Sequence, residues 1–464
     1  MIPVSCGQIA EAVGGELFGV DPAAVVDAAV VIDSRKVEPG GLFVAFDGEN
    51  VDGHDYVAAV TAAGATASIT TRAIAGSPCI VVPNAQTALG ELARLVISQL
   101  PNLTVVGLTG SQGKTSTKDL IAQLLAPYGE TVAPYGSFNN ELGHPLTALQ
   151  TNEQTRFLVA EMGARHVGDI TYLCRITPPK IGMVLNVGHS HIGEFGSRDA
   201  IAQGKGELIE AVLPGGTAIL NADDPRVAAM TARTKESVVT FGEGPDADVR
   251  ATDVVLDADG RPGFTLHVGG TEHAVQLQLV GEHQVPNALA AAAAVQAAGL
   301  TPEQIAAGLN TASTKSKWRM EVTERADGVT VINDAYNANP DSVRAALKAL
   351  VAIGRARGAR TWAVLGPMGE LGDTSLEEHD GIGRLAVRLD VNRLVAVGEA
   401  ARPIHLGASL EGSWGNESAY VDSSDEALEL LRKELRQGDV VLVKASRFVG
   451  LDRLATALIE EASQ

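Results

Sequence analysis

The sequence has few cysteines, and they are poorly placed for disulfide bonds or for a zinc site. Only three occur in 464 residues, Cys6, Cys79 and Cys174, and they lie far apart. A disulfide framework needs paired cysteines, and a structural zinc site needs closely spaced ones. We therefore expect three buried, reduced thiols in a cytoplasmic protein.

Long apolar runs are missing as well. No uninterrupted apolar stretch approaches the about 20 residues that a membrane-spanning helix needs. The first residues, MIPVSCGQIAEAVGG, lack the basic start and the long apolar core of a signal peptide. These absences again favour a cytoplasmic protein without a membrane span.

Basic residues are in the minority. The chain has 36 Lys and Arg against 56 Asp and Glu, which gives a formal net charge of −20. A protein this acidic is poorly suited to coat nucleic acid or an anionic membrane. It can bind anionic ligands only at local sites, built from particular Lys, Arg, backbone N–H groups or metal ions. We expect no nucleic-acid partner and a monomeric chain.

Aromatic residues make up only 4% of the chain, whereas glycine is abundant. Small residues favour helices packed closely on sheets, and the alternation of apolar strands with helical stretches indicates an α/β protein. We predict three domains: a small α/β domain over 1–101, a central P-loop-type domain with a mainly parallel sheet over 102–313, and a doubly wound, Rossmann-like domain over 314–464. Segment 28–36 is read as a strand of the first domain, and 247–280 as an antiparallel appendage of the second.

The stretch GLTGSQGKTSTKDL, residues 107–120, resembles a phosphate-binding loop but lacks one of its glycines, because Leu108 stands where the usual pattern has Gly. An apolar strand precedes it and a helix is expected to start near Lys114. Gly110 and Gly113 allow backbone N–H groups to approach phosphate oxygens at the helix N-terminus. Lys114 adds a positive charge, and Thr115 offers a hydroxyl to Mg²⁺. The alternative is an ordinary glycine turn before a helix.

Two further strands end in residues that suit a metal ion. RFLVAEMG ends near Glu161, and IGMVLNVGHSHIGEFGS leads into a loop with His189 and His191. Parallel strands bring such ends to one edge of a sheet, and carboxylates are preferred Mg²⁺ ligands. For Glu161 alone the alternative is a solvated strand end, and for each histidine it is a structural hydrogen bond.

Eight motifs occur here in one order, and together they resemble the Mur ligases of peptidoglycan synthesis over nearly the whole chain. They are TGSQGKTSTKD, SFNNELGHPLTAL, LVAEMGARHVGDI, NVGHSHIGEFGS, GEHQVPNALAA, WRMEV, NDAYNANPDSVRAAL and VLGPMGELGD. The segment DSRKVEPGGLFVAFDGENVDGHDY extends the resemblance into the first domain. The short TGxxGKT loop is the family's own form of the phosphate loop, which accounts for Leu108.

The resemblance implies a reaction. Within the family, the motifs SFNNELGHPLT, NDAYNANPDS and LGPMGELG match the branch that extends a UDP-N-acetylmuramoyl tripeptide by D-alanyl-D-alanine. ATP phosphorylates the peptide carboxylate, and the dipeptide amine then attacks the acyl phosphate. Whether the third residue of the tripeptide is lysine or diaminopimelate cannot be read from the sequence.

The resemblance also implies site residues around ATP and two Mg²⁺ ions. The phosphates lie on Gly110, Ser111, Gln112, Gly113, Lys114, Thr115 and Ser116. Thr115 and Glu161 serve one Mg²⁺, His191 helps to hold a second, and Lys205 matches a lysine that is often carbamylated and so bridges to the metal. Asn140 matches a polar residue near phosphate and substrate. Lys114, Lys205, His191 and Asn140 form the catalytic set.

The remaining implied contacts come from the outer domains and one helix. Asn287 matches the adenine contact, although an N-cap residue is equally natural. Arg319 and Asp334 would contact ATP phosphate and ribose. Tyr336, Asn337 and Asn339 would line the dipeptide site. Ser34 and Arg35 would contact the UDP-sugar, although a surface salt bridge is the alternative for Arg35.

One motif departs from the family. Where the family tends to have Lys-Gly-Ser-Arg, this chain has Lys444-Ala445-Ser446-Arg447. Alanine does not readily adopt a positive φ, but the loop should still form if that position is not left-handed. The rival functions are a Mur ligase adding the third amino acid, a folylpolyglutamate synthetase-like ligase, and a P-loop kinase.

Overall fold

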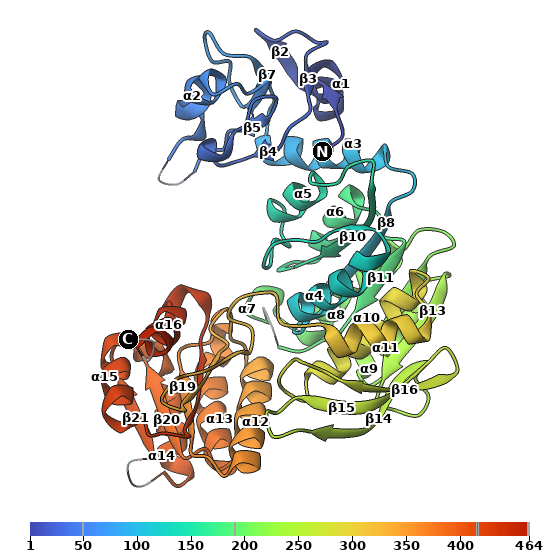
Figure 1. Ribbon diagram of the computed structural model, residues 1–464. Coiled ribbons are helices and arrows are strands. Elements are labelled where there is room, and N and C mark those ends of the chain that lie inside the picture. Colours follow the sequence, from blue (N-terminus) through green and yellow to red (C-terminus); the bar gives the residue numbers. More distant parts are fainter. Residues whose placement is uncertain (49–50, 190–191, 414, 416, 462–464) are drawn as a thin grey trace.

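The computed structural model describes residues 1–48, 51–189, 192–413, 415 and 417–461. Three large sheets follow one another along the chain, from the blue N-terminal part through the green and yellow middle to the red C-terminal part (Figure 1). This confirms the expected α/β class with three sheet-based parts. Among the described residues no helix is both long and apolar enough to cross a membrane.

The N-terminal part contains a five-stranded sheet of order β2-β7-β6-β5-β4, in which only β2 is antiparallel to its neighbour, and a small β1-β3 ladder. Its strands are β1 (Val4–Ser5), β2 (Glu16–Phe18), β3 (Val25–Val26), β4 (Val30–Val31), β5 (Leu42–Val44), β6 (Ala67–Thr70) and β7 (Cys79–Val81). Its helices are α1 (Cys6–Val13), η1 (Ser34–Lys36), η2 (Gly53–Tyr56), α2 (Val57–Ala62) and α3 (Ala85–Ser98).

The strand predicted over 28–36 is present only in part, and its second half is not a strand. Only Val30–Val31 pairs as β4, and the chain then turns into the 3-10 helix η1. The Asp33 side chain causes this turn, because its Oδ1 accepts a hydrogen bond from the Arg35 backbone N–H at 3.1 Å. Such local side-chain bonds compete with strand pairing.

The central sheet has nine strands in the order β16-β15-β14-β13-β12-β11-β8-β10-β9. Its strands are β8 (Thr104–Thr109), β9 (Glu130–Val132), β10 (Thr155–Glu161), β11 (Ile181–Val184), β12 (Thr217–Asn221), β13 (Ser237–Gly242), β14 (Val249–Leu256), β15 (Pro262–Val268) and β16 (Thr271–Gln276). In the sheet, every neighbouring pair from the β9 edge as far as β13–β14 is parallel. The pairs β14–β15 and β15–β16 are antiparallel. The antiparallel segment expected over 247–280 therefore exists, and β14 joins it to the same sheet.

Helices cover both faces of the central sheet (Figure 1). They are α4 (Lys114–Leu125), η3 (Ala126–Tyr128), α5 (Gly143–Ala148), α6 (Asp169–Ile176), α7 (Ile192–Phe195), α8 (Arg198–Glu210), α9 (Pro225–Ala228), η4 (Ala229–Arg233), α10 (Gln284–Ala297) and α11 (Pro302–Thr311). The alanines of α10 from Ala288 to Ala294 are almost completely buried. A helix that is apolar on all sides belongs in a core, and its small side chains allow close approach to α4 and to the sheet.

The expected N-cap position of Asn287 is wrong. Helix α10 already begins at Gln284, with His283 before it, so Asn287 lies inside the helix. Its side chain is buried and donates a hydrogen bond to Gln284 Oε1 at 2.9 Å. The polar pair explains how an asparagine can be buried in an otherwise alanine-rich helix.

Helix α3 links the first two sheets. Leu89 and Leu92 of this helix belong to one continuous hydrophobic core with Leu158 and Leu173 of the central part. The expected boundary near 101 thus separates two sheets but not two cores. We keep 1–101, 102–313 and 314–464 as proposed domains on the basis of the sheets alone.

The C-terminal sheet has six strands in the order β17-β18-β22-β19-β20-β21, and only β17 is antiparallel. Its strands are β17 (Glu321–Glu324), β18 (Thr330–Asn333), β19 (Thr361–Leu365), β20 (Arg393–Val397), β21 (Ser418–Val421) and β22 (Val440–Lys444). Its helices are α12 (Pro340–Arg357), η5 (Gly372–Thr374), α13 (Ser375–Arg388), η6 (Glu399–Ala401), α14 (Arg402–Glu411), α15 (Ser424–Glu434), η7 (Arg447–Val449) and α16 (Leu451–Glu461). Separate apolar clusters fill its two faces, as in a doubly wound sheet.

Candidate active site

A cleft of about 1160 Å³ lies where loops of the central and C-terminal sheets meet, with Gln86 of α3 at its N-terminal side. Most of the predicted site residues line it. They are Ser111, Gln112, Gly113, Lys114, Thr115, Ser116, Asn140, Glu161, Arg319, Tyr336, Asn337 and Asn339. The sheet order explains this convergence: β8 lies between β10 and β11, and all three run in the same direction.

The phosphate loop has the expected geometry. Strand β8 ends at Thr109 and α4 begins at Lys114, with Gly113 before it at φ +80°. A Cβ at Gly113 would lie 2.3 Å from Asn287 Oδ1, so the glycine serves both the turn and the close approach of α10. Gly110 belongs to the same turn but does not line the cleft, and its carbonyl accepts a hydrogen bond from Lys114 Nζ at 2.6 Å.

Asn186 is a loop-supporting residue that the sequence analysis missed. Its Oδ1 accepts hydrogen bonds from the backbone N–H groups of Ser111 and Gln112, at 3.0 and 2.9 Å. Asn186 follows β11, the strand beside β8, so its position after an apolar strand was the available signal. The contact fixes the loop conformation from the neighbouring strand.

Positive charges gather at the loop. Burial lowers the pKa of Lys114, the nearby Glu161 carboxylate opposes that shift, and the Arg319 guanidinium adds to it. Arg319 crosses from the C-terminal part and donates to Thr115 Oγ1 and Ser137 Oγ, both at 3.3 Å. An anion bound at this loop would thus meet two cationic side chains and the N-terminus of α4.

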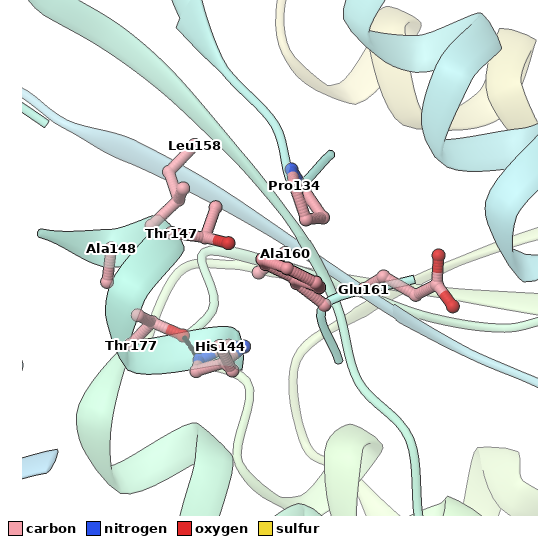
Figure 2. A pocket seen from close by; sticks show the side chains of 9 residues that line it. Pro134, His144, Thr147, Ala148, Leu158, Ala160, Glu161 and Thr177 are labelled. Carbon is pink, nitrogen blue, oxygen red and sulfur yellow. Dashed lines mark hydrogen bonds between the residues drawn. The ribbon is translucent and has the colours of Figure 1, made fainter. Parts of the chain in front are cut away.

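Glu161 ends β10 and is 1% exposed. Its Oε1 accepts a hydrogen bond from Asn139 Nδ2 at 2.7 Å, whereas Oε2 is buried and has no hydrogen-bond partner within the described chain. In Figure 2 the carboxylate points away from the small cavity around His144. A buried carboxylate oxygen without a partner is costly, so this side chain fits a cation ligand such as Mg²⁺.

The two neighbouring asparagines have different surroundings. Asn139, which the sequence analysis did not select, contacts Glu161. Asn140 lines the cleft, and its Oδ1 accepts a hydrogen bond from the Gly143 N–H at 2.9 Å at the start of α5. The role of Asn140 near phosphate stays a prediction.

Lys205 does not line the cleft but is 1% exposed in α8. Burial, and then the positive charge of Lys114, lower its pKa well below the ordinary value. No hydrogen bond from its ammonium group is present within the described parts of the chain. His191 lies outside the described residues. Its neighbour His189 contacts Asp341 Oδ2 through its backbone N–H at 3.1 Å, a structural hydrogen bond.

Of the predicted C-terminal contacts, Asp334 is not among the residues that line the cleft. Its Oδ2 accepts a hydrogen bond from Lys444 Nζ at 2.5 Å, and its Oδ1 accepts one from the Met320 N–H at 3.1 Å. Asn339 lines the cleft and also caps α12, because its Oδ1 accepts a hydrogen bond from the Ser342 N–H at 2.9 Å. The ribose contact of Asp334 stays a prediction.

Ser34 and Arg35 are not among the residues that line the cleft. The Arg35 side chain is 87% exposed and forms a salt bridge with Asp33 at 2.8 Å. The salt bridge given as the alternative is therefore present. Their contact with a UDP-sugar would belong to a separate surface of the N-terminal part and stays a prediction.

The Lys444-Ala445-Ser446-Arg447 segment forms a loop despite the alanine. Ala445 is completely buried and is not one of the described non-glycine residues with positive φ. Alanine is therefore tolerated without backbone strain. Its Cβ contributes to the apolar packing of the C-terminal sheet.

A small cavity behind Glu161 holds a buried histidine (Figure 2). His144 is 3% exposed, and its Nε2 lies 2.8 Å from Thr177 Oγ1. Burial lowers the pKa of His144 to about 4, with backbone contacts to Glu161 and Leu173 opposing the shift. The folded protein therefore keeps this imidazole neutral at neutral pH.

This burial predicts an acid-dependent loss of stability. An unfolded histidine has a pKa of about 6.5, so the unfolded state takes up a proton as pH falls from about 6.5 towards 4 while folded His144 does not. On going from pH 7 to pH 5, this group should lower the free energy of unfolding by about 2 kcal/mol. Urea unfolding of the wild type and His144→Gln at both pH values should show a smaller loss in the variant. Equal losses would contradict the assignment.

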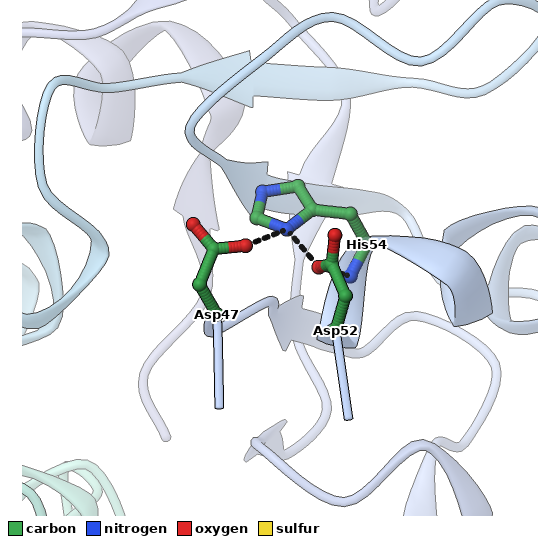
Figure 3. Close-up of side chains that lie close together, drawn as sticks. All are labelled: Asp47, Asp52 and His54. Atoms are coloured by element: carbon green, nitrogen blue, oxygen red, sulfur yellow. Dashed lines mark hydrogen bonds and ion pairs between the residues drawn. The ribbon is translucent and has the colours of Figure 1, made fainter. Parts of the chain in front are cut away.

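A second cluster, in the N-terminal part, has the composition of a metal site but the hydrogen bonds of a structural one (Figure 3). His54 Nδ1 lies 2.7 Å from Asp52 Oδ1 and 3.2 Å from Asp47 Oδ1. Its Nε2 accepts a hydrogen bond from the Thr71 N–H at 2.9 Å, which places the ring proton on Nδ1. Because Nδ1 then donates to the carboxylates and Arg72 also pairs with Asp52, the cluster holds the loop without a cation.

Three family models match the chain in order. The Mur ligase family catalytic domain matches residues 28–96, the Mur ligase middle domain matches 108–295, and the Mur ligase glutamate ligase domain matches 318–447. The middle-domain match contains the phosphate loop and Glu161. The glutamate ligase match contains Arg319 and the dipeptide-site candidates.

Proteins of known name match along the full length. The UDP-N-acetylmuramoyl-tripeptide–D-alanyl-D-alanine ligase of Mycobacterium tuberculosis is 50% identical over 503 aligned positions, covering 99% of this chain and 98% of that protein. The Escherichia coli ligase of the same name is 34% identical and covers 100% of both chains.

Solved structures agree with these matches. MurF from Acinetobacter baumannii superposes with a TM-score of 0.89 at 35% identity over 99% of each chain. MurF from Thermotoga maritima, solved in complex with ADP, superposes with a TM-score of 0.83 at 28% identity, covering 94% of this chain and 98% of that one. With the phosphate loop, Glu161 and the Arg319 crossing in one cleft, these matches establish that the chain belongs to the Mur ligase family.

Proposed function

We propose that this protein joins D-alanyl-D-alanine to a UDP-N-acetylmuramoyl tripeptide, using ATP, in peptidoglycan precursor synthesis. The observation that carries the proposal is the full-length match at 50% identity to a ligase of that name, together with an intact phosphate loop facing the dipeptide-site candidates. The rival kinase function does not account for a third sheet whose loops close one side of the cleft.

The reaction needs cations because it brings an anion to an anion. A peptide carboxylate oxygen attacks the terminal phosphorus of ATP and ADP leaves; the dipeptide amine then attacks the acyl carbon and phosphate leaves. Lys114, Arg319 and the N-terminus of α4 would offset the charge that gathers on the transferred phosphoryl group. Asn287 packs against Gly113 but is not among the residues that line the cleft, and its contact with the adenine base is part of the proposal.

Thr115 and Glu161 would hold Mg²⁺, because the buried Glu161 Oε2 has no hydrogen-bond partner in the described chain. Bound Mg²⁺ would neutralise phosphate charge and orient the phosphoryl group for transfer. A second ion held with His191 is part of the same proposal. Asn139 would orient the Glu161 side chain through its hydrogen bond to Oε1.

Carbamylation of Lys205 is proposed on its chemistry. Burial and the charge of Lys114 lower its pKa, which favours the neutral amine, the form that reacts with carbon dioxide. The product carries a negative charge in place of a positive one, and the neighbouring Lys114 would stabilise that charge. Carbamylated Lys205 could then bridge towards a metal ion.

The substrates would approach from opposite sides. The UDP-sugar would lie on the N-terminal part, with Ser34 and Arg35, and the tripeptide would reach the cleft past Gln86 and Tyr172, which line it. The dipeptide would lie against Tyr336, Asn337 and Asn339. We also propose a cytoplasmic location, since both nucleotide substrates are cytoplasmic compounds. The enzyme is further proposed to be a monomer.

Mass spectrometry of the products tests the function. Incubation with ATP, Mg²⁺, UDP-N-acetylmuramoyl tripeptide and D-alanyl-D-alanine should give ADP, phosphate and the UDP-linked pentapeptide. ADP release should require both the peptide acid and the dipeptide. If ADP forms at the full rate when the peptide acid or the dipeptide is omitted, a kinase or hydrolase is favoured. If single amino acids are ligated in place of the dipeptide, the other ligases are favoured. Parallel reactions with lysine- and diaminopimelate-containing tripeptides would identify the third residue.

A further inference from the structure

We infer that Arg447 binds the C-terminal carboxylate of the incoming dipeptide and so selects a free acid over blocked or longer acceptors. This inference rests on the proposed function, which supplies the dipeptide. Arg447 is exposed at the start of η7, shortly after β22, and lines the cleft on its C-terminal side. No role was expected for it from the sequence.

Its two polar neighbours are already engaged in the fold. Lys444 Nζ donates to Asp334 Oδ2 at 2.5 Å and to the Asn337 carbonyl at 2.9 Å. Ser446 Oγ accepts a hydrogen bond from the Gly369 N–H at 2.8 Å and donates to the Ala338 carbonyl. Both side chains therefore hold the 334–339 loop. Ser446 and Arg447 both line the cleft, and Arg447 is the charged residue of this segment that does so.

The other cations that line the cleft have partners. Lys114 and Arg319 contact the phosphate loop. Arg165 forms a salt bridge with Glu370 at 3.2 Å. Within the described residues, the Arg447 guanidinium has neither an ion pair nor a hydrogen bond, so its five N–H donors are available to a ligand.

Aromatic rings hold Arg447 in place without satisfying those donors. Its guanidinium carbon lies 4.6 Å from the ring centroid of Trp318 and 5.2 Å from that of Tyr336. Arg319 lies 4.2 Å from the Tyr336 centroid, so one ring connects the dipeptide side of the cleft to the phosphate side. Stacking orients a guanidinium while leaving its edge free for a carboxylate.

The chemistry of the acceptor matches this arrangement. D-Alanyl-D-alanine has two methyl side chains and two charged ends, and its amine must be neutral to attack. The carboxylate is then the permanent charge by which it can be recognised, and arginine binds carboxylates in a bidentate manner. An extended dipeptide spans about 7 Å, which is in keeping with an amine at the phosphate side and a carboxylate beyond Tyr336. Phe448, which is 76% exposed beside Arg447, offers apolar surface to a methyl group.

The test compares D-alanyl-D-alanine with its C-terminal amide in ligation assays with ATP and the tripeptide saturating. The wild type should prefer the free acid by roughly 10- to 100-fold in kcat/KM, the range expected for losing a charge-assisted bidentate contact. Arg447→Met should raise the KM for the dipeptide by a similar factor and abolish the preference, with the KM for ATP and for the tripeptide unchanged. Arg447→Lys should recover part of the preference, and Arg453→Met, an exposed arginine of α16 outside the cleft, should behave as wild type.

The outcomes separate this inference from the proposed function. An Arg447→Met enzyme that keeps the preference, or whose KM rises for the tripeptide instead of the dipeptide, would overturn the assignment of Arg447 while leaving the ligase function intact. A wild-type enzyme that does not ligate D-alanyl-D-alanine would refute the proposed function itself. Thermal unfolding of both Arg447 variants checks that the fold is retained, and the preference of Arg447→Lys decides the question should the methionine variant unfold.

Discussion

Replacing Lys114 with alanine is expected to lower the ligation rate by at least roughly 10²–10³-fold, as for other lost transition-state donors. Lys114 stands at the first turn of α4, and its Nζ already reaches back over the loop to the Gly110 carbonyl at 2.6 Å. In the loaded site the same ammonium would face the phosphates, where charge gathers as the phosphoryl group is transferred. Removing it leaves Arg319 as the main remaining cation.

The Lys114→Ala experiment measures ADP release under saturating substrates. Lys235→Ala provides a matched control, since Lys235 is exposed and lies outside the cleft. Lys114→Arg keeps the charge but changes its reach, and we expect it to recover only part of the rate. Near-normal turnover of the Lys114→Ala enzyme would refute the role assigned to the phosphate loop, on which the proposed mechanism depends.

Glu161→Gln should have the next largest effect, a loss of roughly 10²-fold in turnover with a higher Mg²⁺ requirement. The substitution keeps the shape of the side chain and an oxygen for Asn139, but it removes the negative charge at the end of β10. Turnover measured over a Mg²⁺ titration should show a shifted midpoint. Glu153→Gln, at an exposed position, is the control.

Stability gives an independent readout for Glu161. In the metal-free protein its buried Oε2 lacks a hydrogen-bond partner in the described chain, and a neutral amide is less costly to bury than a charge. Thermal unfolding in EDTA should therefore find Glu161→Gln at least as stable as the wild type. Mg²⁺ with nucleotide should then stabilise the wild type more than the variant. A variant that is stabilised equally would show that Glu161 does not hold the metal.

The predictions that were confirmed depend on local sequence, whereas those that needed correction depend on contacts between distant segments. The β8–loop–α4 unit follows from local sequence, because an apolar run, two glycines and a helix-forming segment each favour their own conformation. Asn287 could not be placed in this way. Its position inside α10, against Gly113, depends on how that alanine-rich helix packs on α4.

The two asparagines of SFNN illustrate the same limit. Nothing in the sequence tells which of Asn139 and Asn140 turns towards Glu161, because the answer depends on where the loop before α5 meets the end of β10. Asn186 and Arg447 likewise acquire their roles from segments that are distant in sequence. Their residue types alone would fit any surface loop.

The sequence by itself determined the α/β class, the phosphate loop, the strand-end position of Glu161 and the family, since these depend on local periodicity and on ordered motifs. Only the tertiary structure decided that Lys444 and Ser446 hold the 334–339 loop and that Lys205 is buried beside Lys114. It also decided that Arg447 faces the cleft without an ion pair to any residue that the structure describes. The physical reason is that burial and pairing of a charged side chain depend on which other segments surround it, and that is settled by packing rather than by neighbours along the chain.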